Sequence, residues 1–170
     1  MNGLDISKIN IRKATHTDFD FFYKIKCEYS NIFWTGHKET PNYEELKEWY
    51  NRTILCNDKK VISIASYVDQ DIGYLYIDII EKNLLEIAIA ISENFQGKGF
   101  GFYVLKDFMR RILNNYDKPE ITAWIFESNI ASKKIFTKSG FIASQEKRKR
   151  FFPLKNSYKI QVKYIYGEGH

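Results

Sequence analysis

The sequence ISENFQGKGFGFYVLKDFMRRI, which spans Ile91–Ile112, contains the most informative pattern in the chain. Gly97, Gly99 and Gly101 stand at every second position, between an apolar run and a segment whose apolar residues have helical spacing. Because glycine has no Cβ atom, a ligand can reach the backbone amides, and a helix N-terminus attracts anions. The pattern is typical of a phosphate-binding turn, and equally of a tight strand-to-helix turn that binds nothing.

Two common nucleotide-binding motifs do not fit these glycines. The dinucleotide-binding fingerprint has the spacing G-x-G-x-x-G after the first strand, whereas this chain has G-x-G-x-G after its fourth expected strand. The P-loop requires Gly-Lys followed by Ser or Thr, and here Gly99 follows Lys98. Neither motif explains the turn.

Length and composition predict a single globular domain. The chain has 170 residues, of which 44% are hydrophobic and 28% are charged, and this is the size of one domain. No apolar stretch reaches the roughly 20 residues that a membrane span needs, and the N-terminal residues lack the apolar core of a signal peptide. We expect a cytoplasmic protein with one domain at residues 1–167, followed by an expression-tag remnant at residues 168–170.

The charge and the cysteines narrow the class of partner. A net charge of +5 and an isoelectric point near 9.0 favour an anionic partner, whether a cofactor, an acidic substrate or nucleic acid. Cys27 and Cys56 are too few for a disulfide framework and lack the spacing of metal ligands. We therefore expect a reduced protein that holds no metal.

The rest of the chain predicts alternating strands and helices. Strands are expected at residues 9–14, 60–68, 72–80, 84–91, 120–126, 141–152 and 158–166. Helices are expected at residues 15–29, 43–54, 102–116 and 129–139, the first capped by Thr17 and the last ended by Gly140. A loop is expected at residues 30–42 and a hairpin turn at residues 69–71. This β-α-α-β-β-β-α-β-α-β-β order predicts an α/β fold, with a single mixed, mostly antiparallel sheet flanked by helices on both faces.

Two motifs resemble those of a known family. Gln96–Gly101, QGKGFG, resembles the Q/R-x-x-G-x-G/A signature of the GCN5-related N-acetyltransferase (GNAT) family. Asn129–Phe141, NIASKKIFTKSGF, resembles the family's N-x-x-(A/S)-x-x-x-(Y/F)-x-K-x-G-F helix. The resemblance extends over residues 9–166 and implies the acyl-CoA N-acyltransferase fold. It is nearest to the branch of ribosomal-protein, polyamine and nucleotide-sugar N-acetyltransferases.

The resemblance implies a site for acetyl-CoA. In this family the strand before the turn pairs with the pantetheine arm, which implies the backbone of Ile89 and Ile91. The turn binds the pyrophosphate, which implies the amides of Gln96, Gly97, Lys98, Gly99, Phe100 and Gly101, with added positive charge from the lysine. Asn129 and Ser132 match positions whose side chains reach the pantetheine and phosphate groups. Asn129 also fits a helix N-cap, and Ser132 a solvated position.

Acetyl transfer from a thioester to an amine needs a base, a group that polarises the carbonyl and a proton for the leaving sulfur. Glu86 is the candidate base, because it is the one charged residue of the apolar run LLEIAIAI and apolar surroundings favour protonation of a carboxylate. It also fits a rim residue or the partner of a lysine. The resemblance implies that the backbone N–H of Ile91 polarises the carbonyl.

Two positions depart from the family pattern. Phe136 stands where many relatives carry a general-acid tyrosine, and Trp124 stands where some relatives carry a basic glutamate. Proton transfer typically contributes about 10²- to 10⁴-fold, and the positioning of two reactants can contribute more. Either the acid is water or another tyrosine, such as Tyr74 or Tyr76, or the protein binds acyl-CoA without catalysing a reaction.

The acceptor side is marked by aromatic and basic residues. In this family the loop between the first two helices contributes to the acceptor pocket, and here it carries Trp34 and His37. Trp34 also fits an anchor of the loop, and His37 a solvated residue. The run KRKR, residues 147–150, places its charges on alternate faces of a strand, which is poor for nucleic acid and would suit an anionic acceptor if one face lines the cleft.

These observations predict an acetyl-CoA-dependent N-acetyltransferase that acetylates a primary amine by direct attack in a ternary complex. The expected acceptor is an amino sugar nucleotide or a protein amine. The alternative is a non-catalytic acyl-CoA-binding protein. We expect no nucleic-acid or membrane partner, and a monomer or a homodimer.

Overall fold

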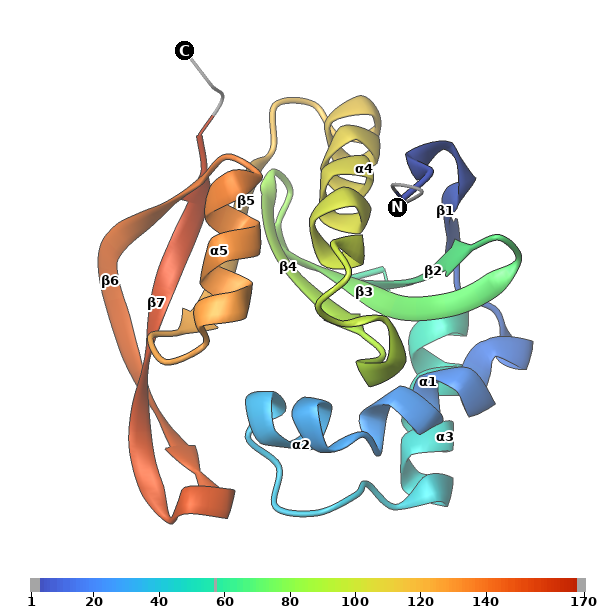
Figure 1. Cartoon of the computed structure of the whole chain (residues 1–170), viewed down its shortest axis with the longest axis horizontal. Coiled ribbons are helices and arrows are strands. Elements are labelled where there is room, and N and C mark those ends of the chain that lie inside the picture. The colour runs from blue at the N-terminus through green and yellow to red at the C-terminus, as the bar shows by residue number, and fades with distance from the viewer. Residues whose placement is uncertain (1–3, 57, 168–170) are drawn as a thin grey trace.

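The computed structural model describes residues 4–56 and 58–167 (Figure 1). Within these residues, seven strands form one sheet in the order β1-β2-β3-β4-β5-β7-β6, in which only β4 and β5 pair in parallel. The strands are β1 (Ile9–Lys13), β2 (Lys60–Tyr67), β3 (Gln70–Glu81), β4 (Leu84–Ile91), β5 (Glu120–Phe126), β6 (Phe141–Phe152) and β7 (Ser157–Tyr166). The predicted mixed, mostly antiparallel sheet is confirmed. The expected tag remnant at residues 168–170 lies outside the described residues.

Five α-helices accompany the sheet among the described residues. They are α1 (Phe19–Lys26), α2 (Tyr29–Thr35), α3 (Tyr43–Cys56), α4 (Phe100–Asn115) and α5 (Ile130–Lys138). On one face α4 and α5 bury a large apolar core that includes Leu105 and Phe136. On the other face α1 and α3 bury a second core around Phe22 and Tyr50. Within the described residues, no helix is both long and apolar enough to cross a membrane.

The first hairpin turn differs from its prediction. We expected the turn at residues 69–71, but Gln70 and Asp71 belong to β3 and pair with β2. The turn consists of Val68 and Asp69, whose φ angles are 49° and 62°. Two consecutive residues with positive φ match the right-handed twist of paired strands, so a two-residue connection suffices. The prediction gave the turn one residue too many because valine rarely adopts this conformation.

The loop predicted at residues 30–42 is wrong in its first part. Residues Tyr29–Thr35 form α2, which ends at Gly36 with a φ of 76°. A glycine in the left-handed region is the usual end of a helix, so this stop signal was present in the sequence. The predicted N-cap at Thr17 is wrong too, because α1 begins at Phe19 after a single 3-10 turn, His16–Asp18.

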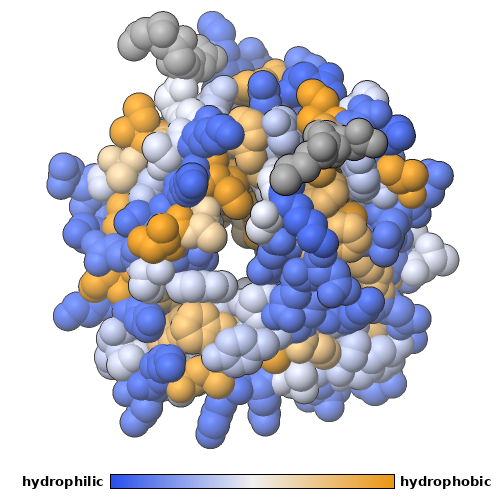
Figure 2. Space-filling view, viewed as in Figure 1, coloured by the Kyte–Doolittle hydropathy of each residue, from blue (hydrophilic) through white to orange (hydrophobic). Residues whose placement is uncertain are grey.

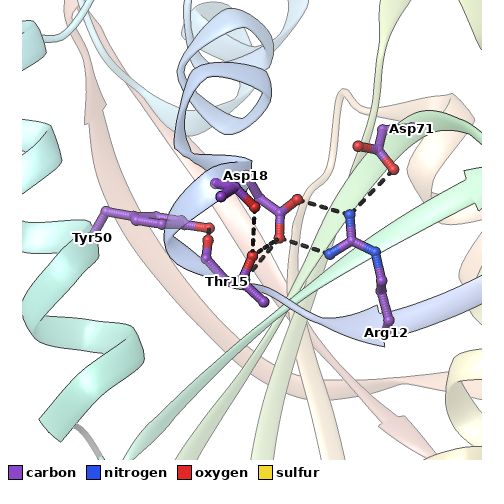
Figure 3. A network of polar contacts seen from close by, with 6 residues as sticks. Arg12, Thr15, Asp18, Tyr50 and Asp71 are labelled. Atoms are coloured by element: carbon purple, nitrogen blue, oxygen red, sulfur yellow. Dashed lines mark hydrogen bonds and ion pairs between the residues drawn. The ribbon is translucent and has the colours of Figure 1, made fainter.

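A polar network fixes the entry into α1 (Figure 3). Both terminal nitrogens of Arg12 donate to the carboxylate of Asp18 at 2.7 Å, and the amide of Thr15 donates to it at 2.7 Å. Tyr50 on α3 donates to the carbonyl of Thr15 at 2.8 Å, and Asp71 on β3 lies 3.6 Å from Arg12. Burial opposes ionisation of Asp18, but the hydrogen bonds from Arg12 and Thr15 outweigh it and hold its pKa below the usual value.

Candidate functional site

The parallel strands β4 and β5 separate soon after they pair. Their register runs from Leu84 opposite Glu120 to Glu86 opposite Thr122, and then stops. The rest of β4, residues 87–91, still pairs with β3 but has no partner on its other edge within the described chain. In the space-filling view of Figure 2, the surface of the molecule that faces the viewer is hollowed near its centre. The sheet therefore opens into a split with Glu86 at its closed end.

The free edge of β4 offers backbone groups of alternate residues. Ser92 donates to the carbonyl of Ile72 on β3 at 2.8 Å. Along one strand of an antiparallel pair, the backbone N–H groups of successive residues point to opposite edges of the strand. Since the amide of Ser92 points toward β3, the amides of Ile91 and Ile89 point away from β3, into the split. An extended ligand can pair with this edge as another strand would. The position fits the pantetheine arm that the resemblance implies.

The glycine turn closes the open end of the split with exposed amides. Gly97 and Gly99 have φ angles of 73° and 89°, which side chains rarely adopt. A Cβ atom on Gly97 would meet nothing within 4 Å, so this glycine serves conformation and access rather than packing. A Cβ atom on Gly101 would lie 2.8 Å from Cδ1 of Ile135 on α5. The first and second glycines shape the turn, and the third lets α4 and α5 pack closely.

The amides of this turn are suited to a phosphate group. No backbone hydrogen bond from the amide of Gly97, Lys98 or Gly99 is found among residues 4–56 and 58–167. These groups precede the N-terminus of α4, a helix of 16 residues, where the helix dipole favours an anion. The residues present therefore fit the pyrophosphate of a coenzyme A molecule.

Two side chains of the turn hold the turn itself. The side-chain nitrogen of Gln96, Nε2, donates to the carbonyl of Ile91 at 2.8 Å and to the hydroxyl of Ser30 at 3.2 Å. The ammonium of Lys98 donates to the carbonyl of Asn94 at 2.7 Å. Gln96 therefore links the end of β4 to α2, and Lys98 places its charge beside the free amides.

A pair of acidic residues joins the turn to α2, and the sequence analysis missed it. Glu93 accepts from the amide of Ser30, at the start of α2, at 2.7 Å. Glu28 accepts from the amide of Glu93 at 2.9 Å and from the hydroxyl of Ser92 at 2.6 Å. Each glutamate caps the segment that carries the other. We find no sequence signal that would have paired two glutamates 65 residues apart.

The second motif lies beside the split but uses its polar residues structurally. The side chain of Asn129 accepts from the amide of Ser132 at 3.1 Å, so it caps α5. Ser132 is half-buried, and no hydrogen bond from its hydroxyl is found in the described part of the chain. Phe136 is 3% exposed, and its ring lies 5.0 Å from that of Phe141. Phe136 is a core residue with no proton to donate.

The closed end of the split gathers charges on one face. Glu86 is half-buried, and across the sheet it lies opposite Asp78 on β3 and Thr122 on β5. Trp124 follows on the same face of β5, and the guanidinium of Arg148 from β6 lies 4.2 Å above its ring. Burial lowers the pKa of Arg148, and the charge of Glu86 partly opposes this. Glu86 and Arg148 therefore act on each other across the split.

The predicted acceptor residues sit on and after α2. Trp34 is half-buried, with its ring 6.2 Å from that of Phe126 on β5, so α2 bridges the two halves of the sheet. His37 is exposed, and its pKa is lowered first by partial loss of water and then by the charges of Lys26 and Arg150. The histidine is therefore neutral near pH 7 and belongs to a cationic neighbourhood.

The two alternative acids lie on the face of β3 that packs against α1 and α3. The hydroxyl of Tyr74 accepts from Asn31 on α2 at 2.9 Å. The hydroxyl of Tyr76 is buried without a hydrogen-bond partner among the described atoms, and burial raises its pKa well above the usual value. The ammonium of Lys26 lies 5.1 and 5.2 Å from the centres of these two rings.

The part of the surface away from the split offers a pocket but, among the described residues, no metal site. A shallow groove on the outer side of α4 is lined by Phe102, Lys106, Arg110, Lys138 and neighbouring side chains. Lys138 and Ser139 of the second motif line it, but none of the predicted site residues does. The described residues contain no group of three or more His, Cys, Asp or Glu side chains arranged to hold a metal ion.

Comparison with known proteins agrees with this geometry. The model of the acetyltransferase (GNAT) domain family matches residues 8–142. YwnH of Bacillus subtilis (strain 168), named as a candidate phosphinothricin acetyltransferase, is 26% identical over 142 residues, which are 78% of this chain and 83% of YwnH.

Solved structures share the fold at low sequence identity. The spermidine N-acetyltransferase of Vibrio cholerae, in complex with CoA and spermine, is 17% identical with a TM-score of 0.82, over 94% of this chain and 95% of that one. The aminoglycoside acetyltransferase AAC(6')-Ib, in complex with coenzyme A, is also 17% identical with a TM-score of 0.77, over the same shares. The split sheet, the glycine turn and the family match lead to one conclusion: the chain belongs to the GNAT family of N-acetyltransferases, for which acetyl-CoA is the co-substrate.

Proposed function

We propose that this enzyme acetylates a primary amine by direct attack in a ternary complex, with Glu86 as the base. The observation that carries the proposal is the place of Glu86, the last residue of β4 that pairs with β5. From there the free edge of β4 leads along Ile89 and Ile91 to the glycine turn. A donor bound along that edge would bring its thioester end toward this carboxylate.

The donor-binding residues follow from the same path. We propose that the backbone of Ile89 and Ile91 pairs with the pantetheine arm, and that the Ile91 amide polarises the thioester carbonyl. The amides of Gln96 to Gly101 bind the pyrophosphate, with positive charge from Lys98. Asn129 and Ser132 contribute from the start of α5. The unbonded turn amides support the phosphate role most directly.

Acetyl-CoA supplies the acetyl group as a thioester. Glu86 takes a proton from the acceptor ammonium, and the neutral nitrogen attacks the acetyl carbon. The new C–N bond forms and the thioester C–S bond breaks, so the electron pair of that bond leaves with sulfur. The nitrogen loses a second proton, and the sulfur gains one to give the free thiol.

The proton on sulfur is best assigned to water. Phe136 has no hydroxyl and lies in the core. The hydroxyl of Tyr76 is buried, and burial raises its pKa well above the usual value. The hydroxyl of Tyr74 accepts from Asn31. A thiol leaving group with a pKa near 8.5, taking cysteine as its model, needs little help from an acid.

The acceptor pocket is proposed between α2 and the split, with Trp34 and His37 on its wall. Relatives of this chain carry names that refer to phosphinothricin, spermidine and aminoglycosides, all of which bear amines. We propose an amino sugar nucleotide or a protein amine as the acceptor here. We also propose that the enzyme acts in the cytoplasm, as a monomer or a homodimer.

The test is the substitution Glu86→Gln, assayed by release of free thiol from acetyl-CoA with a panel of amines. We expect kcat to fall by about 10²- to 10⁴-fold, because a general base contributes that much. The affinity for CoA should stay unchanged, since Glu86 is not among the residues proposed to bind the donor. Glu120→Gln, an exposed position at the start of β5, is the matched control and should keep full activity.

Two results would count against the proposal. Undiminished turnover of Glu86→Gln at neutral pH would assign the base elsewhere. Stabilisation by CoA without thiol release on any amine would instead support a non-catalytic acyl-CoA-binding protein.

A further inference from the structure

Arg148 is held in one position with part of its hydrogen-bonding capacity unused. Its Nε donates to the side-chain oxygen of Gln161 at 2.7 Å, and Gln161 is 6% exposed. Its guanidinium stacks on Trp124. Among residues 4–56 and 58–167, its two terminal nitrogens have no hydrogen-bond partner and no carboxylate within 4 Å. Two parallel N–H groups in this arrangement match an oxyanion.

Further positive charges lie on the same face as Arg148, together with the negative charge of Glu86. Arg150 lies directly opposite Lys159 across β6 and β7, and like charges in such pairs are destabilising. Neither residue has an ion pair in the described chain. Lys26 and Arg150 both lower the pKa of His37, so α1, the end of α2 and β6 bring their charges together. The fold keeps an unfavourable arrangement of cations on this face.

The opposite face of β6 is arranged differently. Lys147 lies 2.8 Å from Glu127 in an ion pair, and Lys149 is exposed. Residues of KRKR therefore alternate between a solvated face and the face that carries Trp124 and Glu86. The half-buried member is Arg148, which lies beside the split and feels the charge of Glu86.

We propose that the acceptor is a small amine that also carries a phosphate, phosphinate or carboxylate group, and that Arg148, supported by Arg150, binds this oxyanion. The inference rests on the proposed acetyl transfer and names its acceptor class. The anion occupies the terminal nitrogens of Arg148, so that the amine end of the same molecule faces Glu86. Polycationic amines are disfavoured, because Lys26, Arg148 and Arg150 set three positive charges against the carboxylate of Glu86.

The first experiment compares acceptors that differ only in the anion. The matched pairs are glucosamine 6-phosphate with glucosamine, and β-alanine with β-alaninamide, with spermine as the polycation. We expect the enzyme to prefer the anionic member of at least one pair by about 10- to 100-fold in kcat/KM, which corresponds to charge-assisted hydrogen bonds of about 1.5–3 kcal/mol. Arg148→Gln should remove this preference, so that the two members of each pair have kcat/KM values within about twofold of each other.

The control is Lys149→Gln, which removes a charge from the same strand on its other face. It should keep the preference for the anionic acceptor. The affinity for CoA should be the same in Arg148→Gln and in the native protein. A loss of CoA binding in Arg148→Gln would assign the guanidinium to the donor and overturn the inference.

The second experiment does not depend on turnover. Titration with glucosamine 6-phosphate in the presence of CoA should change the fluorescence of Trp124, because the bound anion lies against the stacked guanidinium. The change should be absent in Arg148→Gln and in Trp124→Phe, and present in Lys149→Gln. Anion binding that depends on Arg148 without any acetylation would contradict the proposed function and support the oxyanion site. Equal or better use of glucosamine, β-alaninamide and spermine, with no fluorescence change, would overturn the inference.

Discussion

In the half of the sheet formed by β1–β4, charged side chains beside the core are paired. Arg12 binds Asp18 and lies near Asp71, and Lys60 forms an ion pair with Asp78. In the half formed by β5–β7, Arg148, Arg150 and Lys159 lie on one face without a carboxylate within ion-pair distance among the described residues. The first arrangement satisfies charges within the fold. The second arrangement leaves cations that the proposed anionic acceptor would neutralise. Removing a charge should therefore lower stability in the half formed by β1–β4 and weaken acceptor binding in the half formed by β5–β7.

The largest effect is expected at the glycine turn, which lies at the open end of the split between the two halves. Gly99→Glu places a side chain at a φ of 89° and a negative charge among the amides proposed to bind the pyrophosphate. We expect the affinity for CoA, measured by calorimetry, to fall by about 100-fold or more, because facing like charges cost several kcal/mol. Gly99→Asn, which tolerates positive φ and adds no charge, should lose far less. A folded Gly99→Glu protein with native affinity would refute the assignment of the turn.

A smaller effect is expected in the paired half. Asp18→Asn removes the charged partner of Arg12 and of the Thr15 amide, and should lower the free energy of unfolding by about 2 kcal/mol. Urea denaturation measures this change, and Asp5→Asn, at an exposed ion pair with Lys8, is the control that should change stability much less. CoA and acceptor affinities should not change. Equal stability of Asp18→Asn and the native protein would show that the network carries no net stabilisation.

The effect of Asp18→Asn on the free energy of unfolding depends on pH. The pKa of Asp18 is lower in the folded chain than its usual value of 3.8. Its ionised form therefore stabilises the fold above that value, and the contribution is lost as the pH falls through the folded pKa. The difference in stability between the native protein and Asp18→Asn should thus be constant near neutrality and shrink below about pH 3.8. A difference that stays constant into this acid range would contradict the assignment.

The smallest effect is expected in the unpaired half, with the opposite sign. Arg150→Gln removes one member of the like-charged pair with Lys159 and should raise the free energy of unfolding by about 0.5 kcal/mol. Lys149→Gln, which lies opposite Ile160, should leave stability unchanged. A loss of stability in Arg150→Gln would show that the cations on this face stabilise the fold, and the contrast between the two halves would fail.

The sequence predicts most of the fold because local patterns and the two motifs agree. The alternating strands and the helix of 102–116 follow from periodicity, and the glycines mark the turn. The helix α2 was missed, although Gly36 provides the stop signal. Its stability depends on distant partners, including the cap from Glu93 and the contact of Trp34 with Phe126.

The site is less predictable than the fold because it depends on pairing between strands. Periodicity places Arg148 and Arg150 on one face of a strand, but only the register of β6 with β7 and of β7 with β5 brings that face to Trp124. Glu86 stands out in the sequence as a charge in an apolar run. Its position at the last pair of β4 and β5 becomes visible only in three dimensions.

The exchange of caps between Glu28 and Glu93 has a consequence for how acceptor specificity can be altered. The segment that begins α2 and the segment that leads into the glycine turn each supply the carboxylate that the other needs. A transplanted segment that lacks an acid at position 28 would leave the amide of Glu93 and the hydroxyl of Ser92 without their acceptor. Residues 28–30 and 92–96 are therefore best exchanged as one cassette when the enzyme is redesigned for a new amine.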